Sequence, residues 1–423
     1  MARIRIRITL LALGLAALAC NGLVAQPATP SALPPTATGA SPAPLVVAPS
    51  ATPTPSPVAI PATATRVRAS ATPSTAATET ATAAPSAQPT LIAYLRQGQL
   101  LVTDVTKGVA GATIQVTQTG VYDLRWSPSG QSIAFVATVQ NDPHLFVVSG
   151  AGQGAPVDLG PGSEPNWSPD SARLAYVRAG NIWITSVDNP QPQALTTQNN
   201  WVWGRPTFRP AGDALVVSGV STDSMGASGN TQFTLNTLQL DGSGTLTPLP
   251  GLTQLIQGEL PYDLRFSPDG SKLAFTSASH VSACASAGQY FVANADGSGL
   301  TPLTSPAMKA LPVPIPNAEI YYMAFGYAWA PPGDALLITS YVIDCTNFAG
   351  TQLGAQLSTV SLSGQEMLIA KGYFTSPSYD HSGTLIAVAR HTDNSSPGDV
   401  ILYDPNAHLV LDLGQGDQPA FQP

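Results

Sequence analysis

The chain has 423 residues, enough for two or three ordinary domains or for one large array of repeats. Only 10% of the residues are charged, the formal net charge is −8 and the sequence pI is near 5.0. These values argue against nucleic acid and an anionic membrane surface as partners, because both need clustered Lys or Arg. The 40 Pro and 37 Gly favour many turns over long helices, and three Cys are too few for a disulfide scaffold.

The first residues have the pattern of a secretory signal. Arg3, Arg5 and Arg7 form a positive segment, and residues 8–18 form an apolar run. A run of about a dozen residues is too short to span a bilayer of roughly 30 Å as a helix. We therefore predict a signal peptide over residues 1–20 that takes no part in the fold.

The apolar run leads into Ala17-Leu18-Ala19-Cys20. This sequence resembles the signal of bacterial lipoproteins, in which a small residue precedes a cysteine that is diacylated after cleavage. The Leu that usually stands three positions before the cysteine is Ala17 here. The resemblance implies lipid attachment at Cys20 and a location at the outer face of the cell membrane or in the periplasm. The alternative is ordinary signal cleavage further on, for example after Ala25, with Cys20 discarded.

Residues 21–90 are nearly all Ala, Thr, Pro and Ser, and the charged residues among them are Arg66, Arg68 and Glu79. Such a segment buries too little apolar surface to offset the entropy lost on ordering. Its prolines favour extended polyproline II, at about 3.1 Å per residue. We predict a disordered, semi-stiff stalk that holds a folded domain away from a membrane, and the alternative is a leader without a spacing role.

Residues 91–423 carry a repeated turn signature, in which an aromatic residue is followed by Ser-Pro-Asp-Gly or a variant and then by an apolar strand. The proline fixes φ near −65° in the turn, and Gly or Asp takes the position that needs an unusual φ. Four short strands recurring roughly every forty to sixty residues are the signature of a propeller blade. The six aromatic residues are Trp126, Trp167, Phe208, Phe266, Trp329 and Tyr379.

A seventh aromatic residue, Phe421, precedes the last two residues of the sequence. The folded region begins with three expected strands, 91–95, 99–105 and 113–117, which lack a first strand. We therefore predict an all-β, seven-bladed β-propeller of four-stranded antiparallel blades, in which the C-terminal strand joins the N-terminal strands. This closure leaves no open edge between the first and last blades.

The Ser-Pro-Asp-Gly units resemble the WD40-like (PD40) propeller repeats of TolB-type proteins over residues 91–423. The resemblance implies a propeller that serves as a scaffold at the cell envelope. Two departures are expected from the sequence. The extra N-terminal α/β domain of TolB is replaced by the stalk, and the hydrolase domain of prolyl-oligopeptidase relatives does not follow the propeller.

No Gly-x-Ser-x-Gly elbow occurs, and the five His show neither His-x-His nor His-Glu-x-x-His spacing. We therefore expect no catalytic residue, no metal and no cofactor. The alternative is a carbohydrate-active or other hydrolytic propeller, which needs two carboxylates aimed into one cleft. The candidates are Asp123, Glu164, Asp263 and Glu319, but their spacing mostly follows the repeat.

Cys284 and Cys345 follow the aromatic residues of adjacent blades at similar distances. Both are therefore expected in the loop between the second and third strands, on the same face of the propeller. In an exported protein we predict a disulfide between them, which would stabilise the fold by roughly 3–4 kcal/mol. The alternative is a pair of free thiols.

Insertions are expected on the face that carries the second-to-third-strand loops and the connections between blades. The longest, residues 304–326, is rich in aromatic side chains of the kind enriched at interfaces. We predict that this face binds a protein, a peptide or an envelope polymer, and that the protein is a monomer. The alternatives are aromatic side chains that only pack between blades and a structural spacer without a ligand. The candidate partner-binding residues are Tyr321, Tyr322, Phe325, His280 and Asp263.

Overall fold

The computed structural model describes residues 89–423, except for 107, 112, 199, 223–231, 250–251, 253–259, 281–285, 312–317, 347–350 and 394–395. The predicted signal peptide, the lipid attachment at Cys20 and nearly all of the predicted stalk lie outside the described residues and stay predictions. In the part of the chain that is described, no helix has both the length and the apolar character needed to cross a membrane.

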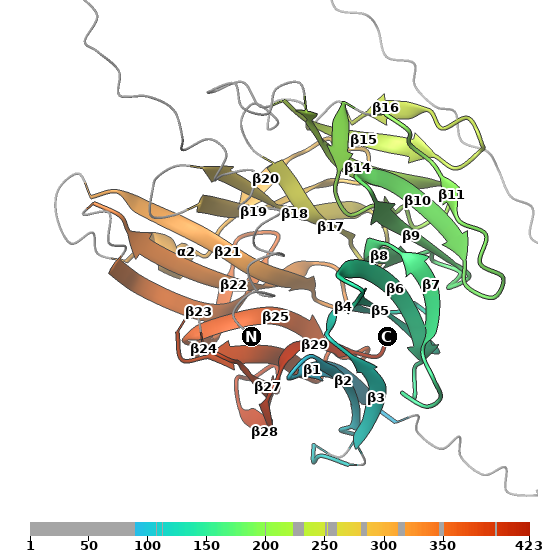
Figure 1. Cartoon of the computed structure of the whole chain (residues 1–423). Helices are drawn as coiled ribbons and strands as arrows, with labels where there is room; N and C mark the ends of the chain where they lie inside the picture. Colours follow the sequence, from blue (N-terminus) through green and yellow to red (C-terminus); the bar gives the residue numbers. More distant parts are fainter. Residues whose placement is uncertain are drawn as a thin grey trace, which may run out of the picture. The chain divides into compact units, whose positions relative to one another are not determined.

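The strands form seven antiparallel sheets, which we number as blades 1 to 7 (Figure 1). Blades 1 to 3 contain β4 (Val121–Trp126), β5 (Ser132–Val139), β6 (Asp142–Ser149) and β7 (Val157–Pro161); β8 (Ser163–Trp167), β9 (Arg173–Arg178), β10 (Asn181–Ser186) and β11 (Gln193–Ala194); and β12 (Trp201–Trp203), β13 (Thr207–Phe208), β14 (Ala214–Ser221), β15 (Phe233–Gln239) and β16 (Leu246–Pro248).

Blades 4 to 7 each have four strands, and blade 7 combines the two ends of the folded region. They contain β17 (Leu260–Phe266), β18 (Lys272–His280), β19 (Ser286–Asn294) and β20 (Thr301–Leu303); β21 (Ile320–Trp329), β22 (Ala335–Asp344), β23 (Thr351–Ser361) and β24 (Glu366–Lys371); β25 (Tyr373–Tyr379), β26 (Ile386–His391), β27 (Asp399–Tyr403) and β28 (Leu409–Gln415); and β29 (Asp417–Phe421), β1 (Leu91–Arg96), β2 (Gln99–Asp104) and β3 (Thr113–Thr119).

These sheets make a seven-bladed, all-β propeller, which confirms the fold predicted from the sequence. In blades 1, 2, 4, 5 and 6 the strands follow the order of the chain, whereas in blade 7 the C-terminal β29 precedes β1. First strands of neighbouring blades contact one another, as β4 does with β8 and β21 with β25. Figure 1 shows the outermost strands β3, β7, β11 and β16 at the periphery. The first strands therefore surround the axis of the propeller.

The pairing of β29 with β1 closes the ring, also as predicted. Ile92 pairs with Phe421 and Ala93 with Ala420. The Arg96 side chain strengthens the join to blade 6, because its guanidinium donates hydrogen bonds of 2.6 Å to two backbone carbonyl oxygens at the end of β28. Both ends of the folded region are thus held in one sheet.

The core is divided among the seven junctions between neighbouring blades. Each junction has its own cluster of buried apolar side chains, drawn from the facing surfaces of two adjacent sheets. The tryptophans of the turn signature also bond across these junctions. The indole nitrogens of Trp126, Trp167 and Trp329 each donate to a backbone carbonyl of the preceding blade, at 2.9, 3.0 and 3.0 Å. The aromatic residues therefore pack between sheets, as expected.

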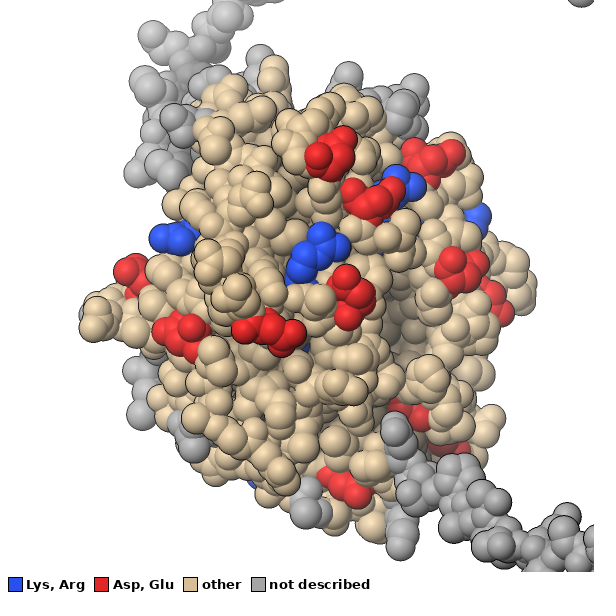
Figure 2. Space-filling view, turned by 90° about the vertical axis from the view of Figure 1, so that its right-hand side faces the viewer, with Lys and Arg blue, Asp and Glu red and all other residues tan. Residues whose placement is uncertain are grey.

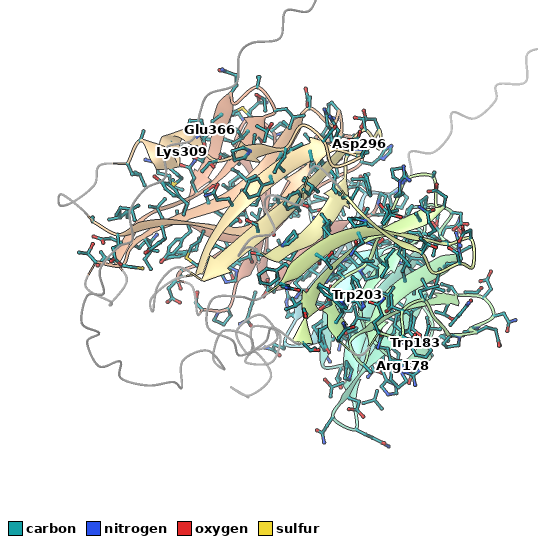
Figure 3. All side chains as sticks on the ribbon, turned by 90° about the horizontal axis from the view of Figure 1, so that it is seen from above. Arg178, Trp183, Trp203, Asp296, Lys309 and Glu366 are labelled. Carbon is teal, nitrogen blue, oxygen red and sulfur yellow. The ribbon has the colours of Figure 1, made fainter. Side chains whose placement is uncertain are left out.

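The one helix of the described residues, α2 (Pro306–Lys309), connects blades 4 and 5. Glu366 holds its N-terminal end, since its carboxylate accepts hydrogen bonds from Ser305 Oγ at 2.6 Å and from the Ala307 backbone N–H at 2.8 Å. Figure 3 labels Glu366 and Lys309 close to each other at this connection. Glu366 of blade 5 thereby satisfies the Ala307 N–H, and the N-cap Ser305 accepts the Met308 N–H at 3.0 Å.

Replacing Phe421 by Ala tests the closure. Phe421 is 5% exposed and packs between blades 6 and 7, so its removal leaves a cavity and should lower the free energy of unfolding by about 3–5 kcal/mol. The matched control is Leu409→Ala on β28, where the side chain is 58% exposed and the change should stay within about 0.5 kcal/mol. Urea unfolding measures both, and equal losses in the two variants would contradict a closing role for Phe421.

Candidate functional site

The first strands of the blades share a backbone distortion at the axis. Their pairing with the second strand shifts register at a bulge, as between Tyr122 and Arg125 in blade 1. The residue three positions before the aromatic lies at this bulge, and in five blades it is a non-glycine residue with φ between 50° and 55°. Left-handed non-glycine residues are uncommon, and their clustering points to a functional region. The five residues are Asp123, Glu164, Asp263, Ser376 and Gln418.

The same position in the other two blades is taken by Arg205 in blade 3 and Gly326 in blade 5. Gly326 has φ 157°, and an added Cβ would lie 3.0 Å from Pro377 Cδ, so a side chain is strained there. At the position three residues before the aromatic, only blades 1 to 4 carry a charged residue. Two further arginines stand directly before the aromatic residues of blades 1 and 4. We call the resulting group the axial cluster: Asp123, Arg125, Glu164, Arg205, Asp263 and Arg265.

Arg205 and Asp123 form an ion pair that joins blade 3 to blade 1. Arg205 Nη2 donates to both carboxylate oxygens of Asp123 at 2.9 Å, while Nη1 donates to the Pro165 carbonyl at 3.2 Å. The Asp123 backbone N–H in turn donates to Gln418 Oε1 of blade 7 at 3.0 Å. Such charge-assisted bonds are stronger than neutral ones and orient both side chains.

Arg265 is also fully engaged. Its Nη2 lies 2.8 Å from Asp263 Oδ2, its Nη1 donates to the Tyr327 carbonyl at 2.8 Å, and its guanidinium lies 5.0 Å from the centre of the Tyr327 ring. Burial disfavours the charged form of Asp263, but the guanidinium groups of Arg265, Arg125 and Arg205 outweigh it and hold the pKa of Asp263 below 3.8. Asp263 is therefore ionised at neutral pH.

Arg125 has looser surroundings. Its Nη2 lies 3.6 Å from Asp123 Oδ1 and 4.0 Å from Asp263 Oδ1, which is beyond hydrogen-bond distance in both cases. Within the described part of the chain, its guanidinium makes no hydrogen bond and its Nε is buried without a partner. Burial, and next the positive charge of Arg205, lower the pKa of Arg125 to about 10.

Glu164 is the acid whose pKa moves upward. Burial raises it above 4.5, and the nearby charge of Arg205 only partly opposes this. Glu164 and Asp263 thus stand in environments that push their pKa values in opposite directions.

Three of the four carboxylates singled out in the sequence, Asp123, Glu164 and Asp263, belong to the axial cluster. The fourth, Glu319, precedes β21, and its backbone N–H donates to Oγ1 of Thr346, which follows β22; the axial position Gly326 lies seven residues further along the chain. The three arginines of the cluster were missed. The signal was present as Asp-Leu-Arg-aromatic, which occurs with identical spacing at Asp123 and at Asp263.

The candidate aromatic residues lie on a strand, where the sequence suggested a loop over residues 304–326. β21 begins at Ile320, so Tyr321, Tyr322 and Phe325 belong to the first strand of blade 5. Phe325 is 41% exposed, and its ring lies 5.7 Å from that of Tyr341. Tyr321 packs, partly buried, against the cluster that contains Tyr341. The expectation of an exposed aromatic group therefore fits Phe325 better than Tyr321.

Two further predicted residues are only partly described. His280 is the last residue of β18 and pairs with Ser286 in register, and its side chain is outside the described set. Cys345 is buried directly after β22, but Cys284 lies outside the described residues. The Cys284–Cys345 bridge therefore stays a prediction.

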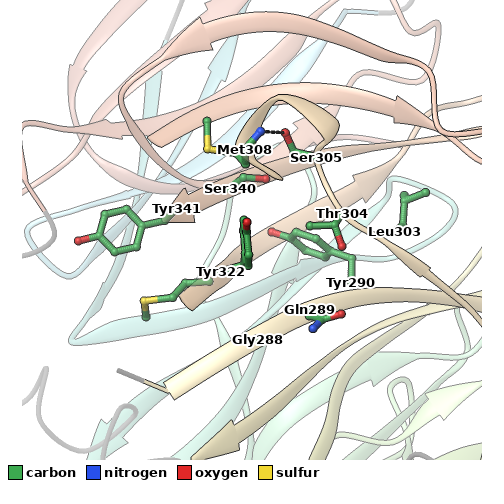
Figure 4. Close-up of a pocket in the computed structure, with 11 residues that line it drawn as sticks. Gly288, Gln289, Tyr290, Leu303, Thr304, Ser305, Met308, Tyr322, Ser340 and Tyr341 are labelled. Atoms are coloured by element: carbon green, nitrogen blue, oxygen red, sulfur yellow. Dashed lines mark hydrogen bonds between the residues drawn. The ribbon is translucent and has the colours of Figure 1, made fainter. Parts of the chain in front are cut away.

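Two hollows lie away from the axial cluster. The one at the junction of blades 4 and 5, lined by Tyr290, Tyr322 and Tyr341, has a volume of about 10 Å³ and holds at most one water (Figure 4). The second is a groove of about 610 Å³ on blades 2 and 3, lined mainly by amide and hydroxyl side chains such as Gln193 and Ser243. Neither contains a group of charged residues comparable to the axial cluster.

The surface itself offers little charge. In the view of Figure 2 most of the surface is uncharged, with scattered Asp and Glu and few Lys or Arg. Among the described residues, no three His, Cys, Asp or Glu side chains gather in a way that could hold a metal ion. The axial cluster, with Phe325 on the neighbouring strand, is therefore the candidate functional site.

No protein-family model and no curated protein matches the chain. Solved structures share its fold. An oligogalacturonate lyase in complex with manganese is 14% identical with a TM-score of 0.51, over 76% of this chain and 84% of that chain. An oligogalacturonate lyase from Vibrio parahaemolyticus is 13% identical with a TM-score of 0.50, over 78% and 85%. TolB from Acinetobacter baumannii is 15% identical with a TM-score of 0.43, over 79% and 83%. At these identities the likeness concerns the fold alone.

Replacing Glu164 by Gln tests the electrostatics of the site. Because the pKa of Glu164 is raised in the folded protein, the native state binds more protons than the unfolded state above pH 4.5. The free energy of unfolding of the wild type should therefore rise as the pH falls from about 7 to about 5, and this component should be absent in Glu164→Gln. Asp263, with its lowered pKa, contributes equally to both proteins in this range.

Urea unfolding at a series of pH values gives the free energy of unfolding of each protein. Subtracting one curve from the other removes the contribution of the groups that the two proteins share. Identical pH dependences in wild type and Glu164→Gln would show that Glu164 does not titrate abnormally. Asp142→Asn is a suitable control, because that carboxylate is exposed at the start of β6 and lies outside the axial cluster.

Proposed function

We propose that this protein is a non-catalytic binding scaffold at the cell envelope, and that the axial cluster together with the aromatic side chains of β21 binds its partner. The partner is a protein, a peptide or an envelope polymer. The signal-like segment and Cys20 support export and lipid anchoring, and the stalk supports a role in presenting the propeller away from the membrane.

The observation that carries this proposal is the pairing of the acidic side chains in the cluster. Asp123 receives two hydrogen bonds from Arg205, and Asp263 receives its closest contact from Arg265. A carboxylate tied to a guanidinium is held ionised and is a poor nucleophile and base. A hydrolytic site of two carboxylates needs one of them protonated and both directed at the substrate bond. The cluster is better suited to recognition.

The uneven distribution of side chains around the axis gives a second argument. Charge lies on blades 1 to 4, whereas blade 5 supplies the exposed ring of Phe325 beside Tyr341, and Tyr341 in turn contacts Tyr373 of blade 6. Binding energy at interfaces is concentrated in aromatic and Arg side chains. A partner that offers both charged and apolar groups would use both halves of the site.

The test is to capture partners from envelope extracts with the purified full chain, and then to measure the dissociation constant of any partner identified. Tyr322→Ala and Phe325→Ala should weaken binding by at least about tenfold each if they are interface anchors. Leu409→Ala, a change of an exposed apolar residue on blade 6, should leave the dissociation constant unchanged. Binding that ignores both aromatic substitutions would contradict the proposed surface, and the absence of any partner would favour a structural spacer.

One observation favours a second function, that of a carbohydrate-active enzyme. Glu164 has the raised pKa of a general acid while Asp263 stays ionised, the division of roles that two-carboxylate catalysis requires. The oligogalacturonate lyases share the fold. A screen of glycans and peptides for cleavage tests this alternative. Turnover that is abolished in both Glu164→Gln and Asp263→Asn would establish it and overturn the scaffold proposal.

A further inference from the structure

The three arginines of the axial cluster are not equivalent. Arg205 and Arg265 each make two kinds of polar contact, to an aspartate and to a backbone carbonyl, at 2.8–3.2 Å. Arg125 instead lies 3.6 Å from Asp123 and 4.0 Å from Asp263, and no hydrogen bond joins it to either. Its side chain is 31% exposed, and its Nε is buried without a partner.

An unsatisfied guanidinium is costly, because a buried donor without a partner loses its hydration and gains nothing in return. Neutralising Asp123 and Asp263 does not explain the arrangement, since Arg205 and Arg265 already do so at hydrogen-bond distance. The Nη donors of Arg125, which make no hydrogen bond to the described residues, therefore remain available to a group that enters from the axis.

The charge of the cluster specifies what that group is. Three arginines face the carboxyl groups of Asp123 and Asp263, the pKa of Asp263 is lowered, and burial favours the neutral form of Glu164. The positive charges of Arg205 and Arg265 disfavour the charged form of Arg125, and a bound anion would offset this. Because two aspartates lie within 4.0 Å, a single negative charge fits better than a double one. A planar carboxylate matches both the charge and the fork geometry of a guanidinium.

We infer that Arg125 forms an anion subsite on the propeller axis that binds a carboxylate group of the ligand. The inference rests on the proposed binding function, and it adds the chemistry of one recognised group: an acidic side chain, a chain-terminal carboxylate or an acidic sugar.

The test uses acetate as the probe and the full chain labelled with ¹⁵N in arginine. The Nε–H resonance of Arg125 is assigned by its loss in Arg125→Lys and followed during titration. We expect a saturable shift with a dissociation constant on the order of 10 mM, as for one bidentate charge-assisted pair. The Nε–H of Arg173, which packs on Phe208 outside the cluster, should not move. The titration is repeated with chloride at equal ionic strength and with inorganic phosphate, to compare other anions with a carboxylate.

Three results would overturn the inference: no saturable shift with acetate, an equal shift with chloride, or tighter binding of phosphate than of acetate. Two variants separate binding from structure. Arg125→Gln should weaken acetate binding at least about tenfold while its melting temperature stays near that of the wild type, because Arg125 makes no hydrogen bond to the described residues. Arg205→Gln, which breaks the bidentate pair with Asp123, should lower the melting temperature. Equal destabilisation by both substitutions would assign Arg125 a structural role.

These outcomes are distinct from a failure of the scaffold proposal. If a partner is captured and Arg125→Gln binds it as tightly as the wild type does, the subsite is wrong and the scaffold stands. If acetate binds at Arg125 but no partner is found, the subsite stands and the scaffold is unsupported.

Discussion

The pairing of β29 with β1 is the interaction on which the rest of the structure depends. No blade has a core of its own, because the buried apolar clusters lie between neighbouring sheets and each sheet must have a neighbour on both faces. Only a closed ring satisfies this requirement for all seven blades. Without the last strand, apolar surface would be exposed on blade 6 and blade 1 together, and about 25 cal/mol of stabilisation would be lost for each Å² uncovered.

Closure also creates the axial cluster. The side chains that form it come from different blades, and most are far apart in the sequence, as with Asp123 and Arg205. They meet because equivalent positions of the first strands face a common axis. Opposite charges then compensate one another in a partly buried region where isolated charges would be expensive. The left-handed backbone at Asp123, Glu164 and Asp263 is maintained by the surrounding sheets rather than by local preference.

The repeat made the fold predictable, because the aromatic residue, the turn and the apolar strand recur with a regular order that only a propeller explains. The site was predictable in part. In the sequence alone, the repeat spacing of Asp123, Glu164 and Asp263 indicates a structural role, yet that same spacing is the reason they converge. The role of Arg125 and Arg265 was not predictable in this way, because an arginine side chain within a strand is usually exposed to solvent. The prediction that Phe325 lies in a loop was wrong, because β21 is longer than the other first strands. No turn residue in the sequence marks where β21 begins.

The composition of blade 7 has a consequence for the order of events in folding. Its innermost strand, β29, is synthesised after every other strand, whereas β1, β2 and β3 are the first of the described strands to be made. The edge of β1 that pairs with β29 therefore stays uncovered until β29 has left the ribosome. Chains of this kind are exposed to premature association for the whole of translation. The sparse charge of the sequence does little to oppose such association.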